Sequence, residues 1–406
     1  MRVVHIAYRY GCNNTGGAAI AATRLHLALS SAGIESHYVC IQKCEDGLNV
    51  HQLPCGWRRR LFFLLTKLFR GVWKFTPYRE SICLNIVPLW GLNRLLEELR
   101  PDVVHIQWMN VDVMSFEQVA SMKWPMVVHL HDVMPINIVN AIAYADRRFI
   151  TGLTKENSTY LERWLHTRKC HVVARKKPLF VAPSEWMARL CRESIIGRGC
   201  VCARVLNVFD ETFRRDPVVS AGKGRFTILF GAYRGRGNPI KGWDDLLRSI
   251  ALLPSTVKRQ MRICVFGESA RPYEQDGIEI TFAGVVLSAH RMCELYNDAD
   301  VLAVPSRIDN APTVKFEALL CGLPVLAFKR TGCAEFLKSG ENGWVAPDMD
   351  FKAYAKGFLF FYEAWRSGDL REIKERIAGW SKTAFEQKRI VEEQLRVYKQ
   401  AIAAAG

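Results

Sequence analysis

Two carboxylates flank the predicted start of a short helix. Asp309 lies in a polar turn, and Glu317 follows after seven intervening residues. Pro312 suits the first turn of a helix, where a missing N–H costs nothing, and Gly322 suits the position just past its end. We therefore expect a helix over residues 313–321. Its free N–H groups would suit a phosphate, and the two carboxylates could hold sugar hydroxyls on either side of it.

The neighbouring residues predict the elements that position this helix. Residues 301–304 (VLAV) form a short apolar run that ends at a Pro-Ser pair, and residues 324–328 (PVLAF) form another. A strand, turn, helix and strand in this order are typical of an open parallel sheet. In such sheets ligands bind beyond the carboxyl ends of the strands, which is where the turn carrying Asp309 would lie.

The same stretch resembles a known family. Asp309-x7-Glu317 is similar to the Glu-x7-Glu motif of the family 4 retaining glycosyltransferases, and the flanking segments EALLCGLPVLAF, TGCAEFL and SGENGWVAP also fit. The resemblance implies that Asp309 contacts a donor sugar, that Glu317 binds the ribose, and that the amides of Thr313 and Val314 bind the diphosphate. Two residues depart from the family pattern, since Asp replaces the first Glu and Pro312 stands where Gly is common. The alternative is an ordinary αβ unit with an exposed Asp and a helical Glu.

Cations precede the next helix upstream. Arg234, Arg236 and Lys241 lie in the loop GAYRGRGNPIKGW, and positive groups before a helix start suit a diphosphate. The resemblance implies that Lys241, followed by Gly242, contacts the diphosphate. The family's second cation, an Arg, is replaced by Ala232, which leaves Arg234 or Arg236 to substitute for it. The alternative is a solvated basic loop.

The first half of the chain predicts a second set of candidates. A strand over residues 2–8 is followed by a loop containing Gly16 and Gly17 and by a helix that runs to about Ser31. Two glycines permit close approach of the backbone to a ligand at a helix start, although a simple tight turn is the alternative. The loop resembles the glycine-rich first loop of the family, which implies a place on the acceptor side near the donor phosphate.

A histidine ends a further predicted strand, residues 126–132 (MVVHLHD). His129 and His131 alternate with an apolar residue and so face the same side. The family has a similar His-Asp pair here, which implies that His131 contacts the donor sugar or the acceptor, with Asp132 as its partner. The alternative is a core histidine, and that reading suits His105 and His129 better.

Residues 57–75, WRRRLFFLLTKLFRGVWKF, predict a basic amphipathic helix that is too short and too charged to span a bilayer. Such a helix could lie in a membrane interface, or it could pack on the domain with a solvated basic rim. The net charge of +16 likewise favours an anionic partner. No zinc finger, RNP motif or helix-turn-helix signature favours nucleic acid.

The remaining composition describes a globular chain. Hydrophobic residues make up 49% of it, enough for well-buried cores. The 13 cysteines are odd in number and lack the paired spacing of a metal site, so we expect most to be reduced and no metal to be bound. The first residues read as a strand and not as a signal peptide, so we expect a cytoplasmic protein that could also sit peripherally on the inner face of the plasma membrane.

These patterns predict an α/β protein of GT-B fold, with two Rossmann-like domains facing a central cleft and C-terminal helices crossing back. The expected boundaries are 1–209 for an acceptor-side domain, 210–225 for a linker, 226–385 for a nucleotide-sugar domain, and 386–406 for a helix that packs on the first domain.

The expected function is that of a metal-independent retaining glycosyltransferase. It would move a sugar from a nucleoside diphosphate sugar to a saccharide or lipid-linked oligosaccharide in cell-surface polysaccharide synthesis, with no cofactor. The alternative is a non-catalytic nucleotide-sugar or membrane-surface binding protein. The candidate catalytic residues are His131, Asp309 and Lys241; the candidate donor-binding residues are Gly16, Gly17, Arg236, Lys241, Asp309, Thr313, Val314 and Glu317.

Overall fold

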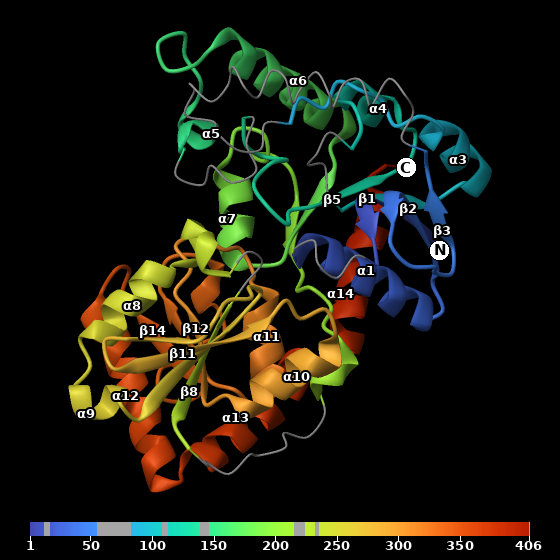
Figure 1. Ribbon diagram of the computed structural model, residues 1–406. Helices are drawn as coiled ribbons and strands as arrows, with labels where there is room; N and C mark the ends of the chain where they lie inside the picture. Colours follow the sequence, from blue (N-terminus) through green and yellow to red (C-terminus); the bar gives the residue numbers. More distant parts are fainter. Residues whose placement is uncertain are drawn as a thin grey trace. The chain divides into compact units, whose positions relative to one another are not determined.

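The structure is a computed structural model that describes residues 1–11, 17–54, 83–107, 113–138, 146–214, 224–231 and 235–405. The chain divides into two compact units (Figure 1). Unit 1 contains the first strand, Ala18–Val208 and the closing stretch from Lys388, and unit 2 contains Phe209–Gln387. The chain therefore returns to unit 1 after completing unit 2.

Unit 1 is built on a seven-stranded parallel sheet of order β3-β2-β1-β4-β5-β6-β7. The order reverses between β1 and β4, which creates a switch point of the kind where ligands bind in doubly wound sheets. The strands are β1 Arg2–Tyr10, β2 Glu35–Lys43, β3 Val50–Gln52, β4 Val103–Ile106, β5 Met126–His129, β6 Leu179–Ala182 and β7 Cys202–Arg204.

Helices cover both faces of this sheet, with α3, α4 and α6 along one face and α1 and α14 along the other (Figure 1). Alternation along β1 fits this arrangement, because Val4 and Ile6 pack in the core with α3 and α4, whereas Ala7 packs with Ala22 of α1. The helices are α1 Gly17–Ser31, α3 Leu92–Leu99, α4 Phe116–Ser121, α5 Arg148–Thr151, α6 Tyr160–Lys176, α7 Glu185–Glu193 and α14 Gln387–Ala403.

Unit 2 repeats the same plan in a sheet of order β10-β11-β9-β8-β12-β13-β14. The neighbouring strands are parallel except for β10, which pairs antiparallel with β11 at one edge. Its switch point lies between β8 and β12. The strands are β8 Phe226–Gly231, β9 Met261–Phe266, β10 Tyr273–Gln275, β11 Ile278–Gly284, β12 Val301–Val304, β13 Val325–Phe328 and β14 Gly343–Ala346.

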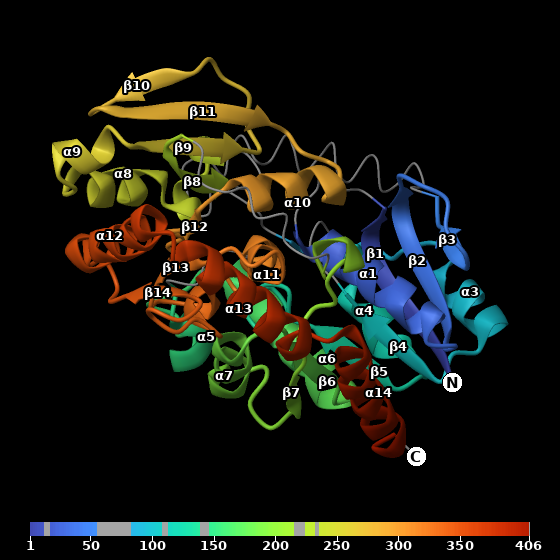
Figure 2. The same cartoon turned by 90° about the horizontal axis from the view of Figure 1, so that it is seen from below.

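The helices of unit 2 form two groups. In one group α8 contacts α12, and in the other α11 contacts both α10 and α13. Figure 2 shows these groups on opposite sides of the sheet. The helices are α8 Trp243–Ala251, α9 Ser255–Lys258, α10 Ala289–Asp298, α11 Thr313–Leu320, α12 Phe351–Ser367 and α13 Leu370–Ala384, with short 3-10 turns η1 Glu211–Arg214, η2 Gly235–Gly237, η3 Pro239–Lys241 and η4 Gly332–Ala334. Two Rossmann-like α/β units were predicted, and the two sheets confirm them.

Some predicted features fall outside the described residues. These are the basic helix Trp57–Phe75, Gly16, Ala232, Arg234, and residues 215–223 of the expected linker. Among the helices that the structure describes, none combines the length and apolar character that a membrane crossing needs.

The last strand of unit 1, β7, ends at Arg204, and residues 205–208 continue the chain as a buried segment outside the strand. Among the described residues ten cysteines are free thiols, as the sequence led us to expect for most of them, but Cys44 takes part in a disulfide.

Candidate functional site

The turn between β12 and α11 forms as the sequence predicted. Pro312 is the N-cap of α11, and Thr313 and Val314 lie in its first turn. The helix ends at Leu320, one residue earlier than expected. Gly322 follows with φ of 79°, and any side chain there would press against the carbonyl of Lys374. The first-turn amides of α11 are therefore held at the carboxyl end of β12 by well-defined start and stop signals.

Lys241 and Asp309 meet although 68 residues separate them in sequence. Lys241 Nζ lies 2.5 Å from Asp309 Oδ2, and the two side chains are only 26% and 16% exposed. Burial alone would lower the pKa of Lys241, but the charge of Asp309 and the hydrogen bond to it outweigh burial and raise that pKa above its ordinary value. The cation predicted for the diphosphate and the acid predicted for the sugar thus form one ion pair.

Two features bring Lys241 to this place. Gly242 has φ of 75°, and a Cβ at this position would clash with the carbonyl oxygen of Pro305 at the end of β12. Arg307 then joins the two loops, because its backbone N–H donates to Ile240 O at 2.8 Å. Its guanidinium forms two bonds, of 2.6 and 2.9 Å, to the fully buried carboxylate of Asp245 on α8. A bidentate pair of this kind fixes geometry as well as charge. Neither Arg307 nor Asp245 was among the candidates predicted from the sequence.

Glu317 lies on α11 about one turn after the helix start, as predicted, and is 6% exposed. Its Oε2 accepts a hydrogen bond of 3.1 Å from the hydroxyl of Tyr296 on α10. A buried carboxylate needs such partners, because leaving it without hydrogen bonds costs on the order of several kcal/mol. The contact of Tyr296 with Glu317 was not foreseen from the sequence.

Lys315, also on α11, is a buried cation that the sequence analysis missed. Its Nζ donates to the carbonyls of Gly332 and Glu335 at 2.8 and 3.0 Å, so it holds the turn that contains η4. The preceding Thr331 accepts a hydrogen bond of 3.3 Å from the backbone N–H of Asp309. In the sequence, this role was indicated only by the presence of a lysine among the apolar residues of a helix predicted to be buried. A buried lysine needs hydrogen-bond acceptors within the protein.

Arg236, a candidate donor ligand, is engaged within the protein. Its Nη2 lies 2.6 Å from Glu268 Oε1, its Nη1 donates to the Tyr273 hydroxyl at 2.9 Å, and its guanidinium stacks over Phe282. The structure therefore holds Arg236 beside β9 and β11, and no contact joins it to the pair formed by Lys241 and Asp309 among the described interactions. Its role towards a donor stays a prediction.

His131 lies in unit 1, two residues after the end of β5. Its ring stacks on His129 with centroids 4.1 Å apart, as expected for side chains on the same side of the chain. Its Nε2 lies 3.1 Å from Gln107 Oε1. Burial lowers the pKa of His131 to about 3, so the ring is neutral at physiological pH. Asp132, predicted as its partner, instead accepts a hydrogen bond from the backbone of Met134.

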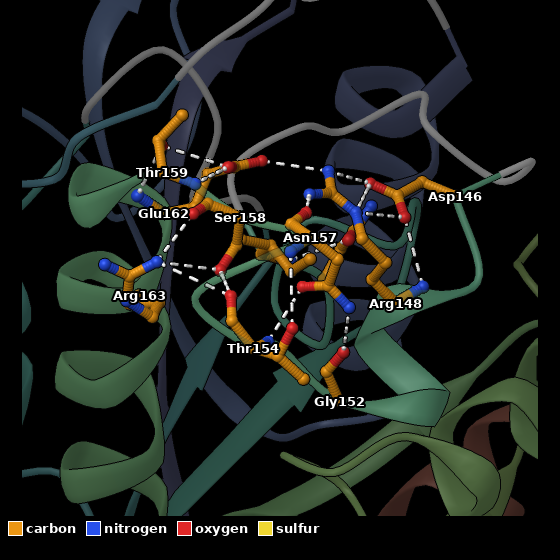
Figure 3. A network of polar contacts seen from close by, with 11 residues as sticks. Asp146, Arg148, Gly152, Thr154, Asn157, Ser158, Thr159, Glu162 and Arg163 are labelled. Carbon is orange, nitrogen blue, oxygen red and sulfur yellow. Dashed lines mark hydrogen bonds and ion pairs between the residues drawn. The ribbon is translucent and has the colours of Figure 1, made fainter.

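A second polar network in unit 1 surrounds the start of α6 (Figure 3). Arg148 lies between Asp146 and Glu162, at 2.7 and 2.9 Å, and Glu162 also forms a capping box with Thr159. These charged groups bind one another and the backbone of the turn. We therefore assign this network a structural role, because its bonds close the turn before α6.

The described residues contain no group of three or more His, Cys, Asp and Glu side chains arranged to hold a metal ion. The candidate groups for an anionic ligand are instead a lysine and the amides at the start of α11. The expectation that the protein works without a metal or cofactor stays a prediction.

This geometry defines a class of protein. Two doubly wound units, with polar residues gathered at the carboxyl ends of the strands of the second, are the architecture of the GT-B fold. Along its whole length the chain matches sucrose-phosphate synthase from Thermosynechococcus elongatus, with a TM-score of 0.67, 16% identity and full coverage of both chains. It also matches Anabaena HepE in complex with UDP-glucose, with a TM-score of 0.62, 15% identity, and coverage of 98% of this chain and 99% of that one.

Comparison of sequences gives matches in both halves of the chain. Residues 15–198 match the model for Glycosyltransferase Family 4, and residues 227–364 match the model for Glycosyl transferases group 1. Both matches agree with the family 4 glycosyltransferases that the sequence resembles, and the GT-B fold is the one that this resemblance predicted. The chain is 27% identical over 188 residues to a D-inositol 3-phosphate glycosyltransferase of Saccharomonospora viridis, covering 43% of each chain. It spans about half the length of the curated relatives that it matches.

Proposed function

We propose that this protein is a retaining glycosyltransferase that transfers a sugar from a nucleoside diphosphate sugar to a hydroxyl of a saccharide acceptor. The observation that carries the proposal is the contact of Lys241 with Asp309, at the carboxyl end of β12 and just before α11. A cation suited to a diphosphate thus lies next to a carboxylate suited to a sugar, and this supports the proposal. The complex of Anabaena HepE with UDP-glucose supports a donor of this class, since HepE shares the fold.

Each residue then has a role. Lys241 and the amides of Thr313 and Val314 neutralise the charge that builds on the leaving diphosphate, which is electrostatic catalysis without a metal. Asp309 accepts hydrogen bonds from hydroxyls of the donor sugar, and Glu317 accepts them from the ribose. These interactions hold the donor with its reacting carbon oriented for attack.

The reaction follows from the donor's chemistry. The bond between the anomeric carbon and the diphosphate oxygen breaks, and the acceptor's hydroxyl oxygen bonds to the same carbon on the same face. The hydroxyl proton passes to the departing phosphate. In this scheme His131 contacts the sugar near the reacting carbon as a neutral imidazole, and it does not supply the proton.

The setting that we propose is cell-surface polysaccharide synthesis, with a saccharide or lipid-linked oligosaccharide as acceptor. The net charge of +16 supports work at an anionic membrane surface, where such an acceptor would be presented. The protein would then act in the cytoplasm, peripherally on the inner face of the membrane.

The test begins with thermal unfolding in the presence of UDP, GDP, ADP, CDP or TDP without added metal. A nucleotide at 100 times its dissociation constant adds about 2.7 kcal/mol to the free energy of unfolding, and we expect one base to stand out. Glu317→Gln should reduce that shift, because the ribose loses a charged acceptor. Turnover of the matching nucleotide sugar would then be measured with saccharide acceptors.

Two outcomes would change the conclusion. A folded protein that no nucleotide stabilises would refute the donor assignment. Donor binding without product for any acceptor would favour the alternative function, a non-catalytic nucleotide-sugar binding protein of the same fold.

A further inference from the structure

A second charged pair joins the two segments of unit 2 that carry Lys241 and Asp309. The guanidinium of Arg307 forms bonds of 2.6 and 2.9 Å to the two carboxylate oxygens of Asp245, which is fully buried on α8. Arg307 lies two residues before Asp309, and Asp245 lies four residues after Lys241. The two ion pairs therefore connect the same two segments of the chain.

The bonds of this second pair have only one direction. A guanidinium donates and a carboxylate accepts, so Nε and Nη2 of Arg307 donate in parallel to Oδ2 and Oδ1 of Asp245. Two parallel bonds fix the orientation of both groups, whereas a single bond would let one group rotate about the other. Arg248, on the same helix as Asp245, lies farther from its carboxylate, at 3.9 Å. Arg307 is therefore the main partner of Asp245 among the described residues.

Backbone contacts hold the chain on both sides of Lys241. The N–H of Arg307 donates to Ile240 O at 2.8 Å, and Gly242 lies so close to the carbonyl of Pro305 that a Cβ there would clash with it. These contacts tie the two loops together but do not reach α8. The side-chain pair of Arg307 adds that link.

The two ion pairs differ in burial. Removing the cation from a fully buried carboxylate such as Asp245 is strongly destabilising, so the turn that carries Arg307 cannot leave α8 without a large loss of stability. The pair of Lys241 and Asp309 is partly exposed, and an incoming anion can replace the carboxylate there. A rigid pair thus lies beside an exchangeable one.

We propose that Arg307 is a positioning residue, whose pair with Asp245 holds the turn of Asp309 against α8 so that Asp309 stays beside Lys241. A diphosphate then competes with a carboxylate that is fixed in place. The consequence for donor binding rests on the proposed function, but the position of Asp309 beside Lys241 is a property of the unliganded protein. Neither Arg307 nor Asp245 needs to touch the ligand for this role.

The first experiment measures the coupling between Lys241 and Asp309 without ligand. Urea unfolding of Lys241→Met, Asp309→Asn and the double variant gives the coupling free energy of the pair. The same cycle is then repeated in the background of Asp245→Asn, which keeps the shape of that side chain and removes its charge. We expect the coupling to fall towards zero in this background. If the Arg307 pair only stabilises the fold, every variant will lose stability equally and the coupling will be unchanged, which would overturn the proposal.

The second experiment measures binding of the nucleoside diphosphate that stabilises the wild-type protein most. In the wild-type background Asp309→Asn should tighten its binding about 10-fold, because the competing carboxylate is removed. In the Asp245→Asn background the same substitution should change the affinity by no more than about 2-fold. Equal gains in both backgrounds would contradict the positioning role. If no nucleotide binds, the proposed function fails, and the coupling measured without ligand still decides the positioning.

Asp146→Asn is the matched control, because Asp146 accepts two parallel bonds, of 2.9 and 2.7 Å, from Arg148 in unit 1. Among the described interactions, none joins Asp146 to Lys241 or Asp309. The control should lower stability without changing either the coupling or the nucleotide affinity. A control that reduced the coupling as much as Asp245→Asn does would show a general effect of lost stability and would refute the assignment to Arg307.

Two further variants cover the remaining cases. Arg307→Lys keeps the charge but cannot bond both carboxylate oxygens in parallel, so the coupling should fall part of the way. A wild-type coupling in this variant would refute the need for two parallel bonds. If Asp245→Asn does not fold, Asp245→Leu combined with Arg307→Met removes both charges together. The same loss of coupling is expected there, and an unchanged coupling would count equally against the proposal.

Discussion

The ion pair of Lys241 and Asp309 predicts that two single substitutions will change nucleotide binding in opposite directions. In the unliganded protein Asp309 neutralises Lys241 across 2.5 Å. A diphosphate that binds Lys241 must compete with this carboxylate and also tolerate its negative charge. Asp309→Asn removes the competitor and keeps the cation, whereas Lys241→Met removes the cation.

The exposure of the pair sets the magnitude. Breaking a fully buried pair by removing one partner costs roughly 3–5 kcal/mol, and an exposed pair contributes about 0–1 kcal/mol. With side chains 26% and 16% exposed, this pair lies between these limits. We expect either substitution to lower the free energy of unfolding by about 2 kcal/mol.

Binding should separate the two variants. Lys241→Met loses a charge-assisted bond to phosphate worth about 1.5–3 kcal/mol, so the nucleoside diphosphate should bind roughly 10-fold to 100-fold more weakly. Asp309→Asn should bind the same nucleotide about 10-fold more tightly if about 1.4 kcal/mol of competition is relieved. For the nucleotide sugar the gain should disappear, because Asp309 also holds the sugar.

Calorimetric titration of both variants with the nucleotide and with its sugar conjugate is the assay. Asp146→Asn is the control, since Asp146 pairs with Arg148 at 2.7 Å with side chains of similar exposure, 19% and 23%. That variant should lose stability without changing nucleotide affinity. If Asp309→Asn and Lys241→Met weaken nucleotide binding equally, the pair is only structural and the reasoning fails.

Two further predictions concern acid and metal. Burial lowers the pKa of His26 to about 4 and lowers the pKa of His5, His105 and His129 below the ordinary value near 6.5. Below pH 6.5 the unfolded chain therefore binds more protons than the folded chain. Each of these histidines should lower the free energy of unfolding by up to about 1.4 kcal/mol per pH unit in that range. Urea unfolding at pH 7.5, 6.5 and 5.5 measures this, and equal midpoints would contradict it. A chelator such as EDTA should leave sugar transfer unchanged, because Lys241 and the α11 amides supply the positive charge. If EDTA abolished transfer and added metal restored it, the metal-free mechanism would be contradicted.

Local elements were predictable because local signals define them. The apolar runs of β12 and β13, the proline before α11 and the glycine after it gave that unit nearly to the residue. The resemblance to family 4 then gave roles for Asp309 and Glu317. Where an apolar run continued past the sheet, as at residues 205–208, periodicity alone could not tell a strand from a buried loop.

Contacts between distant residues were not predictable from the pattern. Lys241 meets Asp309 because β8 and β12 are neighbours in the sheet, and a single sequence does not contain the strand order. His105 meets Tyr398, 293 residues later, because α14 returns to unit 1. The buried lysine at position 315 could be recognised as unusual, but its acceptors became known only when the turn at Gly332 was placed beside α11.

One physical rule links the candidate residues. Each polar side chain at these strand and helix ends is partly or wholly withdrawn from water, so each has a partner in the protein: Asp309 for Lys241, Tyr296 for Glu317 and Gln107 for His131. A ligand that binds such a group either displaces the partner or uses the remaining bonding capacity of the group. Lys241 belongs to the first case, because its pair with Asp309 competes with phosphate. Substituting Asp309 should therefore strengthen nucleotide binding.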